Sequence, residues 1–255
     1  MKFKIMKKLI LIQNDFSGSG KSTVVRLLRR YLNQHRVPHQ FIMLDEEEIS
    51  SEPEVQYLNP TQPGVMRQLL DVLEESQINI MEAATGFGEL VAKLYEQHEF
   101  YSVLSDMGIE LTVVLPVTND PESFDAVTQA AEIYSDNVQY LIAHNTTSAY
   151  DEDDGSWDSC YAARVMDMFE AVELRFPSSG VEMDNAFRTQ HTHLAAALQE
   201  PDAESLYGKE FARWYKRSIG QVETARQYLF GDAFRSLADT TKEPAKRGRK
   251  AKAVF

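Results

Sequence analysis

The stretch KLILIQNDFSGSGKSTVVRLLRRYLNQH at residues 8–35 decides the fold of this 255-residue chain. Its first part, 8–14, is an apolar run that predicts a buried strand. A glycine-rich turn follows at 15–23, and from residue 24 onward apolar side chains recur at helical spacing. This order is typical of a loop that holds phosphate groups. Glycines let backbone N–H groups approach a phosphate closely, and the helix directs the positive end of its dipole at the same place.

The residue types in the turn suit that task. Gly18 and Gly20 give the backbone its conformational freedom. Lys21 would reach the outer phosphates, and the Ser22 hydroxyl would bind Mg²⁺. The predicted nucleotide-binding residues of the loop are Ser17, Gly18, Ser19, Gly20, Lys21, Ser22 and Thr23. The pattern departs from GxxxxGK[ST] at its first glycine, which is Asp15 in this chain. A carboxylate beside phosphates is repulsive unless it points away from them.

Strands and helices alternate along the rest of the chain. Apolar runs at 39–48, 78–81, 110–118, 138–145 and 171–176 predict further strands, and amphipathic stretches between them predict helices. This alternation predicts one α/β domain over residues 1–238, with a mostly parallel sheet flanked by helices. Residues 50–63 contain three prolines and are predicted to form a loop. Residues 203–234 are predicted to form a long C-terminal helix.

The charge of the chain is unevenly distributed. The formal net charge is −13, but the first eight residues carry four Lys and residues 242–252 carry six Lys or Arg and one Glu, which leaves a body of net charge −22. An acidic body argues against broad nucleic-acid binding by the fold itself. The single cysteine, Cys160, excludes an intramolecular disulfide framework and a cysteine-based zinc site. Because no apolar run reaches about 18 residues, we expect a cytoplasmic protein without a membrane span.

Residues 239–255 are rich in Lys, Arg, Ala, Gly and Pro, which predicts a basic flexible tail. The tail contains Arg-Gly-Arg and resembles an AT-hook, whose arginines enter the narrow minor groove of A·T-rich DNA. The candidate DNA contacts are Lys246, Arg247, Arg249 and Lys250, the last of which replaces the proline usual in such hooks. A basic tail that binds polyanions without preference is the alternative interpretation.

Four strand ends resemble those of the ParA/MinD superfamily of SIMIBI-type P-loop ATPases. The pattern is most similar to the plasmid conjugation and stability proteins called TraL and StbB. Asp45 and Glu47, in LDEEE, match the family's D-x-D at the end of the second strand. Glu82, in EAATG, matches the start of its D-x-P-A-G switch. Asn145, in LIAHN, and Pro177 match the residues with which the family contacts adenine.

The resemblance covers roughly residues 8–230 and implies an ATP-binding protein that acts as a slow ATPase. Its nucleotide states would change binding to a partner or to DNA in plasmid segregation, conjugation or intracellular positioning. The implied catalytic residues are Lys21, Asp45 and Glu47, and the implied Mg²⁺ residues are Ser22, Asp45 and Glu82. One departure concerns the oligomeric state. The family's early loop lysine, which crosses a dimer interface, is Phe16 in this chain.

Two other functions remain open. A small-molecule P-loop kinase also fits SGSGKST. However, only two Lys or Arg residues, Arg67 and Lys93, lie between residues 36 and 164, and kinases surround the transferred phosphate with several cations. A non-hydrolysing, nucleotide-gated adaptor fits the departures at Asp15, Phe16 and Glu82.

Single residues also have structural interpretations. The acids at 45–48 can be a solvated turn, and Glu82 can be an acid at a helix N-terminus. Asn145 can serve as a turn residue.

Overall fold

The computed structural model of the chain describes residues 6–46, 54–97, 99–145, 155–200 and 202–240. Its sheet consists of β1 (Lys7–Ile12), β2 (Gln40–Leu44), β3 (Val55–Leu58), β4 (Ile78–Ala83), β5 (Ile109–Val117), β6 (Gln139–Asn145) and β7 (Val172–Phe176). Their order is β3-β2-β4-β1-β5-β6-β7, and each neighbouring pair is parallel. The predicted α/β fold with a mostly parallel sheet is confirmed. Because the strands are parallel, their carboxyl ends share one edge of the sheet.

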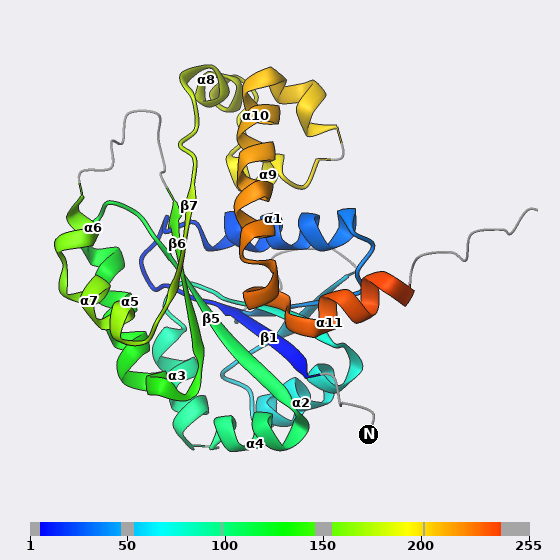
Figure 1. Cartoon of the computed structure of the whole chain (residues 1–255), viewed down its shortest axis with the longest axis vertical. Coiled ribbons are helices and arrows are strands. Elements are labelled where there is room, and N and C mark those ends of the chain that lie inside the picture. The colour runs from blue at the N-terminus through cyan, green and yellow to red at the C-terminus, as the bar shows by residue number, and fades with distance from the viewer. Residues whose placement is uncertain (1–5, 47–53, 98, 146–154, 201, 241–255) are drawn as a thin grey trace, which may run out of the picture.

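Helices cover both faces of this sheet (Figure 1). One face carries α1 (Lys21–Gln34), α8 (Val181–Thr189), α9 (Leu194–Ala197), α10 (Ala203–Thr224) and α11 (Arg226–Thr240). The other carries α2 (Val65–Glu75), α3 (Gly88–Gln97), α4 (Phe100–Met107), α5 (Pro121–Tyr134), α6 (Ser156–Ser159) and α7 (Tyr161–Met168). A short 3₁₀ helix, Ser135–Asn137, precedes β6. Along β1, Ile10 and Ile12 join the first layer whereas Leu9 and Leu11 join the second, as the two-residue period of a strand requires.

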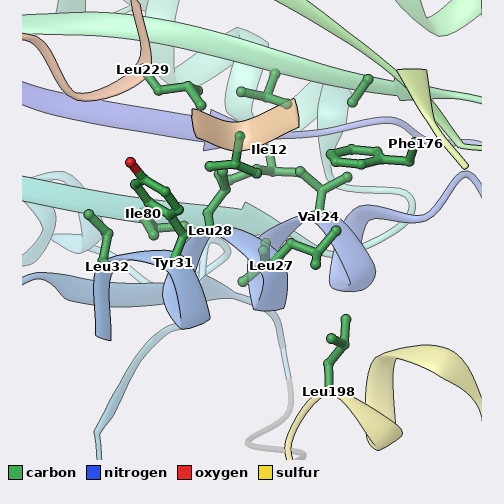
Figure 2. Close-up of a cluster of buried hydrophobic side chains, with 14 of the residues drawn as sticks. Ile12, Val24, Leu27, Leu28, Tyr31, Leu32, Ile80, Phe176, Leu198 and Leu229 are labelled. Carbon is green, nitrogen blue, oxygen red and sulfur yellow. The ribbon is translucent and has the colours of Figure 1, made fainter. Parts of the chain in front are cut away.

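Helix α1 is held tightly against the centre of the sheet. Its apolar face meets side chains from the strands and from the C-terminal helices (Figure 2). The labelled members of this cluster are Ile12, Val24, Leu27, Leu28, Tyr31, Leu32, Ile80, Phe176, Leu198 and Leu229. Full burial of one such aliphatic side chain stabilises the fold by about 1.5–3 kcal/mol. The helix whose first residue is Lys21 therefore has a firmly fixed position.

The prediction of a loop over residues 50–63 is wrong for Val55–Leu58, which form the edge strand β3. This strand pairs in parallel with β2, with Phe41 opposite Val55 and Leu44 opposite Leu58. Prolines are excluded from the interior of a strand but tolerated beside it. Pro60 therefore follows the strand without preventing it.

The predicted long C-terminal helix is present as α10, but it ends earlier than expected and a second helix follows. Helix α10 ends at Thr224, and α11 begins at Arg226. Each also contains one glycine with non-helical backbone angles, Gly208 with φ 82° and Gly231 with φ 55°. No helix in the described ranges is long and apolar enough to span a bilayer. The four predicted DNA contacts of the tail, Lys246, Arg247, Arg249 and Lys250, lie outside the described residues.

Candidate functional site

The glycine-rich turn lies at the carboxyl edge of the sheet, where β1 leads into α1. Strand β1 is central, with β4 on one side and β5 on the other. The strands before β5 in the chain lie on one side of β1, and the later ones on the other. Parallel α/β sheets bind their ligands at such a reversal of strand order, outside the carboxyl ends of the strands.

The turn has the backbone that the sequence pattern requires. Gly18 and Gly20 adopt φ values of +84° and +99°, which residues with side chains rarely do. Gly20 is the N-cap of α1, and the Val24 N–H donates to its carbonyl at 3.0 Å. Position 20 requires glycine for a second reason, because a Cβ there would lie 2.1 Å from Asn145 Nδ2. The fully buried Ser19 leaves its hydroxyl without a hydrogen-bond partner among the described residues.

Lys21 is buried at the start of α1 and joins the turn to the loop between β4 and α3. Its Nζ donates to the Asn14 carbonyl at 2.5 Å and to Thr85 Oγ1 at 2.9 Å. Burial lowers the pKa of this ammonium, and the charges of Glu82 and Asp15 oppose the shift. Both oxygens that it contacts are uncharged. An anion entering the site would therefore gain a desolvated cation as its partner.

Ser22 and Glu82 meet on the other side of the same loop. The Ser22 hydroxyl donates to Glu82 Oε1 at 2.7 Å, and the second carboxylate oxygen, Oε2, has no hydrogen-bond partner among the described residues. Burial raises the pKa of Glu82, and the Ser22 hydroxyl and the charges of Arg26 and Lys21 counteract it. A hydroxyl beside a carboxylate with an unused oxygen suits Mg²⁺, which prefers oxygen ligands.

The described residues contain no group of three or more His, Cys, Asp and Glu side chains that could hold a metal by themselves. This fits a Mg²⁺ bound through one or two protein groups together with phosphate oxygens and water. Asp45 follows β2 and lies close enough to Glu82 for its charge to raise the pKa of that carboxyl. The second acid predicted at this strand end, Glu47, lies outside the described residues.

The predicted loop residues open onto a cavity of about 770 Å³. Its walls contain Gly18, Gly20, Lys21, Ser22 and Thr23 of the turn, together with Asp45, Glu82 and Asn145. Thus the structure brings together residues that the sequence places at four separate points. The exposed Ser17 and the buried Ser19 belong to the same turn but do not line the cavity.

Part of the cavity wall was not predicted. Arg26 on α1 and Tyr57 on β3 contribute to it, as do Asp184, Arg188 and His193 from the region of α8 and α9. Arg26 is four residues after Ser22, and its Nη1 donates to the Ser22 carbonyl at 3.1 Å. Because Arg26 lies one helical turn after Ser22, the sequence could have predicted its place in the cavity wall. Arg188 gives no such signal, because an arginine on a helix is ordinarily solvated.

Of the two residues predicted to contact the nucleotide base, one lines the cavity and the other does not. Asn145, buried at the end of β6, donates from Nδ2 to the Ser19 carbonyl at 3.3 Å and lines the cavity. Pro177 does not line it, but the nearby Ser179 does. The Pro177 carbonyl instead accepts a hydrogen bond from Trp214 Nε1 at 2.7 Å, which ties the end of β7 to α10.

Asp15 points away from the cavity. Its Oδ1 accepts hydrogen bonds from the backbone N–H groups of Gly86 and Gly88. The carboxylate at the departure from the glycine-rich pattern therefore faces the loop after β4. Phe16, at the position of the family's interface lysine, is half-buried, and its N–H donates to Asn14 Oδ1 at 2.8 Å.

The parallel sheet and the glycine-rich turn together define a P-loop α/β fold. No family model and no curated protein matches the chain. Among solved structures, it is similar to the MinD cell division protein of Aquifex aeolicus, with 12% identity and a TM-score of 0.43 over 94% of this chain and 100% of that one.

It is also similar to a Cyanothece McdA–ATP complex, with 14% identity and a TM-score of 0.43 over 85% of this chain and 98% of that one. A third similar structure is FlhF complexed with GMPPNP and Mg²⁺, with 12% identity and a TM-score of 0.37. That match covers 68% of this chain and 66% of FlhF, just under two thirds of its length. These likenesses concern the fold alone. None of the three is a TraL or StbB protein.

Proposed function

We propose that this chain binds Mg-ATP in the cavity at the carboxyl edge of its sheet and hydrolyses it slowly, acting as a nucleotide-dependent switch. The observation that carries the proposal is the convergence of Lys21, Ser22 and Glu82 beside a turn with two glycines at positive φ. The donors and the cation face one cavity, and the carboxylate that would bind a metal lies behind the serine.

Each of these residues has a defined task in the proposal. Lys21 exchanges its neutral oxygen partners for phosphate oxygens and stabilises charge on the outer phosphate. The Ser22 hydroxyl and the carboxylates of Glu82 and Asp45 hold Mg²⁺, directly or through water. The metal, when bound, supplies positive charge to the phosphates. Asp45, with Glu47, orients the attacking water, although phosphoryl transfer depends mainly on positioning and charge.

Adenine is the proposed base. Asn145 lines the cavity beside the turn, where its Nδ2 donates to the Ser19 carbonyl. Pro177 is proposed to act less directly, because its carbonyl anchors the strand end from which Ser179 reaches the cavity. No Asn-Lys-x-Asp pattern, which would recognise guanine, stands at the end of β6.

A P-loop kinase is the second candidate, and the cavity wall favours it. Arg26 and Arg188 line the cavity and supply cations to it. They lie outside the interval between residues 36 and 164, which is poor in Lys and Arg. The cavity also extends to Met43 and Tyr57, at the carboxyl ends of β2 and β3, where a second substrate would have room. Transfer of phosphate to a small acceptor, rather than release to water, would support this candidate. A non-hydrolysing adaptor would bind ATP tightly without turnover.

The proposed biological role is in plasmid or DNA segregation, conjugation or positioning inside the cytoplasm. The two similar structures of the ParA/MinD type support a switch of this kind only by their fold. DNA is the proposed partner of the basic tail, and a protein partner would read the nucleotide state. A homodimer, if it forms, would need contacts other than a lysine at position 16.

The deciding experiment is a titration of the full chain with ATP by calorimetry, with and without Mg²⁺, beside a phosphate-release assay. We expect Mg²⁺-dependent binding and slow release of phosphate. Binding without release over hours would favour the adaptor, and transfer of phosphate to an added acceptor without release to water would favour the kinase. The proposal fails if neither ATP nor GTP binds at millimolar concentration.

A further inference from the structure

The carboxylate of Asp15 joins the phosphate loop to the loop that follows β4. Asp15 Oδ1 accepts from the Gly86 N–H at 3.1 Å and from the Gly88 N–H at 3.0 Å. The bonds connect residues 71 and 73 positions apart in the sequence. Gly88 is the first residue of α3. A carboxylate at this place also interacts favourably with the helix dipole, and bonds to an ionised acceptor are stronger than neutral ones.

The approach of Asp15 depends on glycine at position 88. A Cβ built there would lie 2.4 Å from Asp15 Oδ2 and 2.9 Å from its Cγ, closer than real Cβ atoms come. Gly88 has no positive φ that would require glycine for backbone reasons. The absence of a side chain at position 88 is therefore explained by the space that the Asp15 carboxylate occupies.

Two further contacts of a different kind join the start of α1 to β4 and to the loop that follows it. Lys21 bonds to Thr85, and Ser22 bonds to Glu82. In the proposed function both Lys21 and Ser22 change partners when Mg-ATP enters. Asp15 has no task toward the nucleotide, since it does not line the cavity and its Oδ1 is held by the Gly86 and Gly88 N–H groups. Its two bonds can persist while the other contacts are exchanged.

We infer that Asp15 is a positioning residue that fixes the β4–α3 loop against the phosphate loop, both before and after the nucleotide binds. This inference rests on the proposed function for its consequence in turnover. The geometry of the contact does not depend on any nucleotide. The loop carries Thr85 and directly follows Glu82 near the end of β4, so its position sets where Thr85 meets Lys21 beside the Ser22–Glu82 contact.

Amide hydrogen exchange on the full chain without nucleotide tests the contact directly. In Asp15→Ala, peptides covering residues 84–90 should exchange about tenfold faster or more, because two bonds to a charged acceptor are lost. Asp15→Asn keeps an acceptor of the same shape without the charge and should be intermediate. The control Asp71→Ala removes an exposed acid from α2 and should leave this exchange unchanged.

A double-mutant cycle separates the contact from a general loss of stability. Gly88→Ala should displace the carboxylate and speed exchange of the same peptides, although alanine is a good residue at a helix start. In the Asp15→Ala background, Gly88→Ala should add little, since the carboxylate it displaces is already absent. Equal exchange in wild type and Asp15→Ala would overturn the inference, as would fully additive effects of the two substitutions.

Turnover provides the second measurement. If the chain hydrolyses ATP, Asp15→Ala should lower kcat about tenfold or more while KM for ATP changes less than about twofold, because groups are misplaced without loss of a phosphate contact. Partial recovery in Asp15→Asn is expected. A rise in KM alone would contradict a positioning role. If no variant binds nucleotide, the proposed function fails, while the exchange experiment still decides whether Asp15 holds the loop.

Discussion

Ser22 Oγ donates a hydrogen bond of 2.7 Å to Glu82 Oε1 across 60 residues of sequence, and the other oxygen of Glu82 is buried and has no partner in the part of the chain that the structure describes. An unsatisfied buried carboxylate oxygen is unfavourable for folding. The net effect of the surroundings, dominated by burial, is to raise the pKa of Glu82 and so to favour its uncharged form. The Ser22–Glu82 pair is therefore unfavourable for the stability of the fold, but it supplies the oxygen ligands that a divalent cation requires.

Glu82→Gln should separate these two effects. In the absence of Mg²⁺ and nucleotide, the variant should be more stable than wild type by about 1 kcal/mol, because a neutral amide replaces a buried charge. For a chain of this size this corresponds to a rise in Tm of roughly 2–4 °C. The dependence of ATP affinity on Mg²⁺ should be strongly reduced. Scanning calorimetry measures the Tm, and titration calorimetry with and without Mg²⁺ measures how ATP affinity depends on the metal. A lower Tm together with an unchanged Mg²⁺ dependence of ATP affinity would contradict the assignment.

Lys21→Ala should weaken ATP binding by at least about 30-fold, because removing one member of a buried charge pair costs about 2 kcal/mol or more. The fold should survive, since a desolvated lysine with a lowered pKa gives little stability. The matched control is Lys216→Ala, which removes an exposed lysine on α10. Far-UV circular dichroism verifies folding. Wild-type affinity and turnover in a folded Lys21→Ala protein would rule out the nucleotide site.

ATP should displace a fluorescent nucleotide from the chain at lower concentration than GTP does. The reason is the proposed base contact at Asn145 and the lack of a guanine-recognition pattern after β6. In Asn145→Ala the preference should shrink toward unity. Because Asn145 also donates to the Ser19 carbonyl, the affinity for both nucleotides can fall in this variant, so the ratio is the decisive quantity. Equal or tighter binding of GTP to the wild type would refute the adenine assignment.

Deletion of residues 242–255 should weaken DNA binding without changing the ATPase rate measured in the absence of DNA. The acidic body repels a polyanion unless a cationic segment reaches it first. For the full chain we expect a log–log salt slope of about −2 to −4, and for the truncated chain a slope near zero. Fluorescence anisotropy on duplex DNA at several salt concentrations measures this. An unchanged slope would instead implicate the basic residues of α10, which are Lys209, Arg213, Lys216 and Arg217.

The buried Lys8 should make stability depend on alkaline pH. Burial lowers the pKa of Lys8 below 10.5. The carboxylate of Glu110, whose Oε2 lies 2.7 Å from Lys8 Nζ, opposes this shift. Folding thus disfavours the protonated lysine, and the stability of the wild type should rise with pH between the lowered pKa and 10.5. Tyr228, on α11 and with a pKa raised by burial, titrates in the same surroundings.

Comparison with Lys8→Met isolates the contribution of Lys8, because Glu110 and Tyr228 are retained in that variant. Urea unfolding at a series of pH values should show wild type gaining stability relative to Lys8→Met through this window. Lys216→Met, an exposed substitution, should show no such change. Parallel pH profiles of wild type and Lys8→Met would exclude the proposed effect.

The fold could be predicted because its signals are local. Apolar runs predict the strands, and apolar residues at helical spacing predict α1. The glycines of the turn indicate backbone at positive φ. The break between α10 and α11 has no such signal. The sequence around Ala225 contains neither glycine nor proline, so only packing of the two helices on the sheet separates them. Strand β3 was missed because the neighbouring prolines are a stronger local signal than four residues of an edge strand.

The site was predictable where one stretch of chain supplies it and not where distant segments meet. Lys21 and Ser22 follow from the turn itself. The direction of the Asp15 carboxylate depends on N–H groups more than 70 residues away, which a local pattern does not contain. Arg188 reaches the cavity only because α8 follows the end of β7 on the same face of the sheet as α1.

Helix α11 covers the beginning of β1, where a Cβ at Gly231 would lie 3.5 Å from Lys8 Cε, whereas the phosphate loop follows the end of that strand. Helix α11 and the cavity beside the glycine-rich turn thus lie at opposite ends of β1. A polyanion captured by the tail and a protein reading the bound nucleotide would not compete for space. The molecule could serve as a bridge between the two, with its acidic body acting as the spacer that keeps them apart.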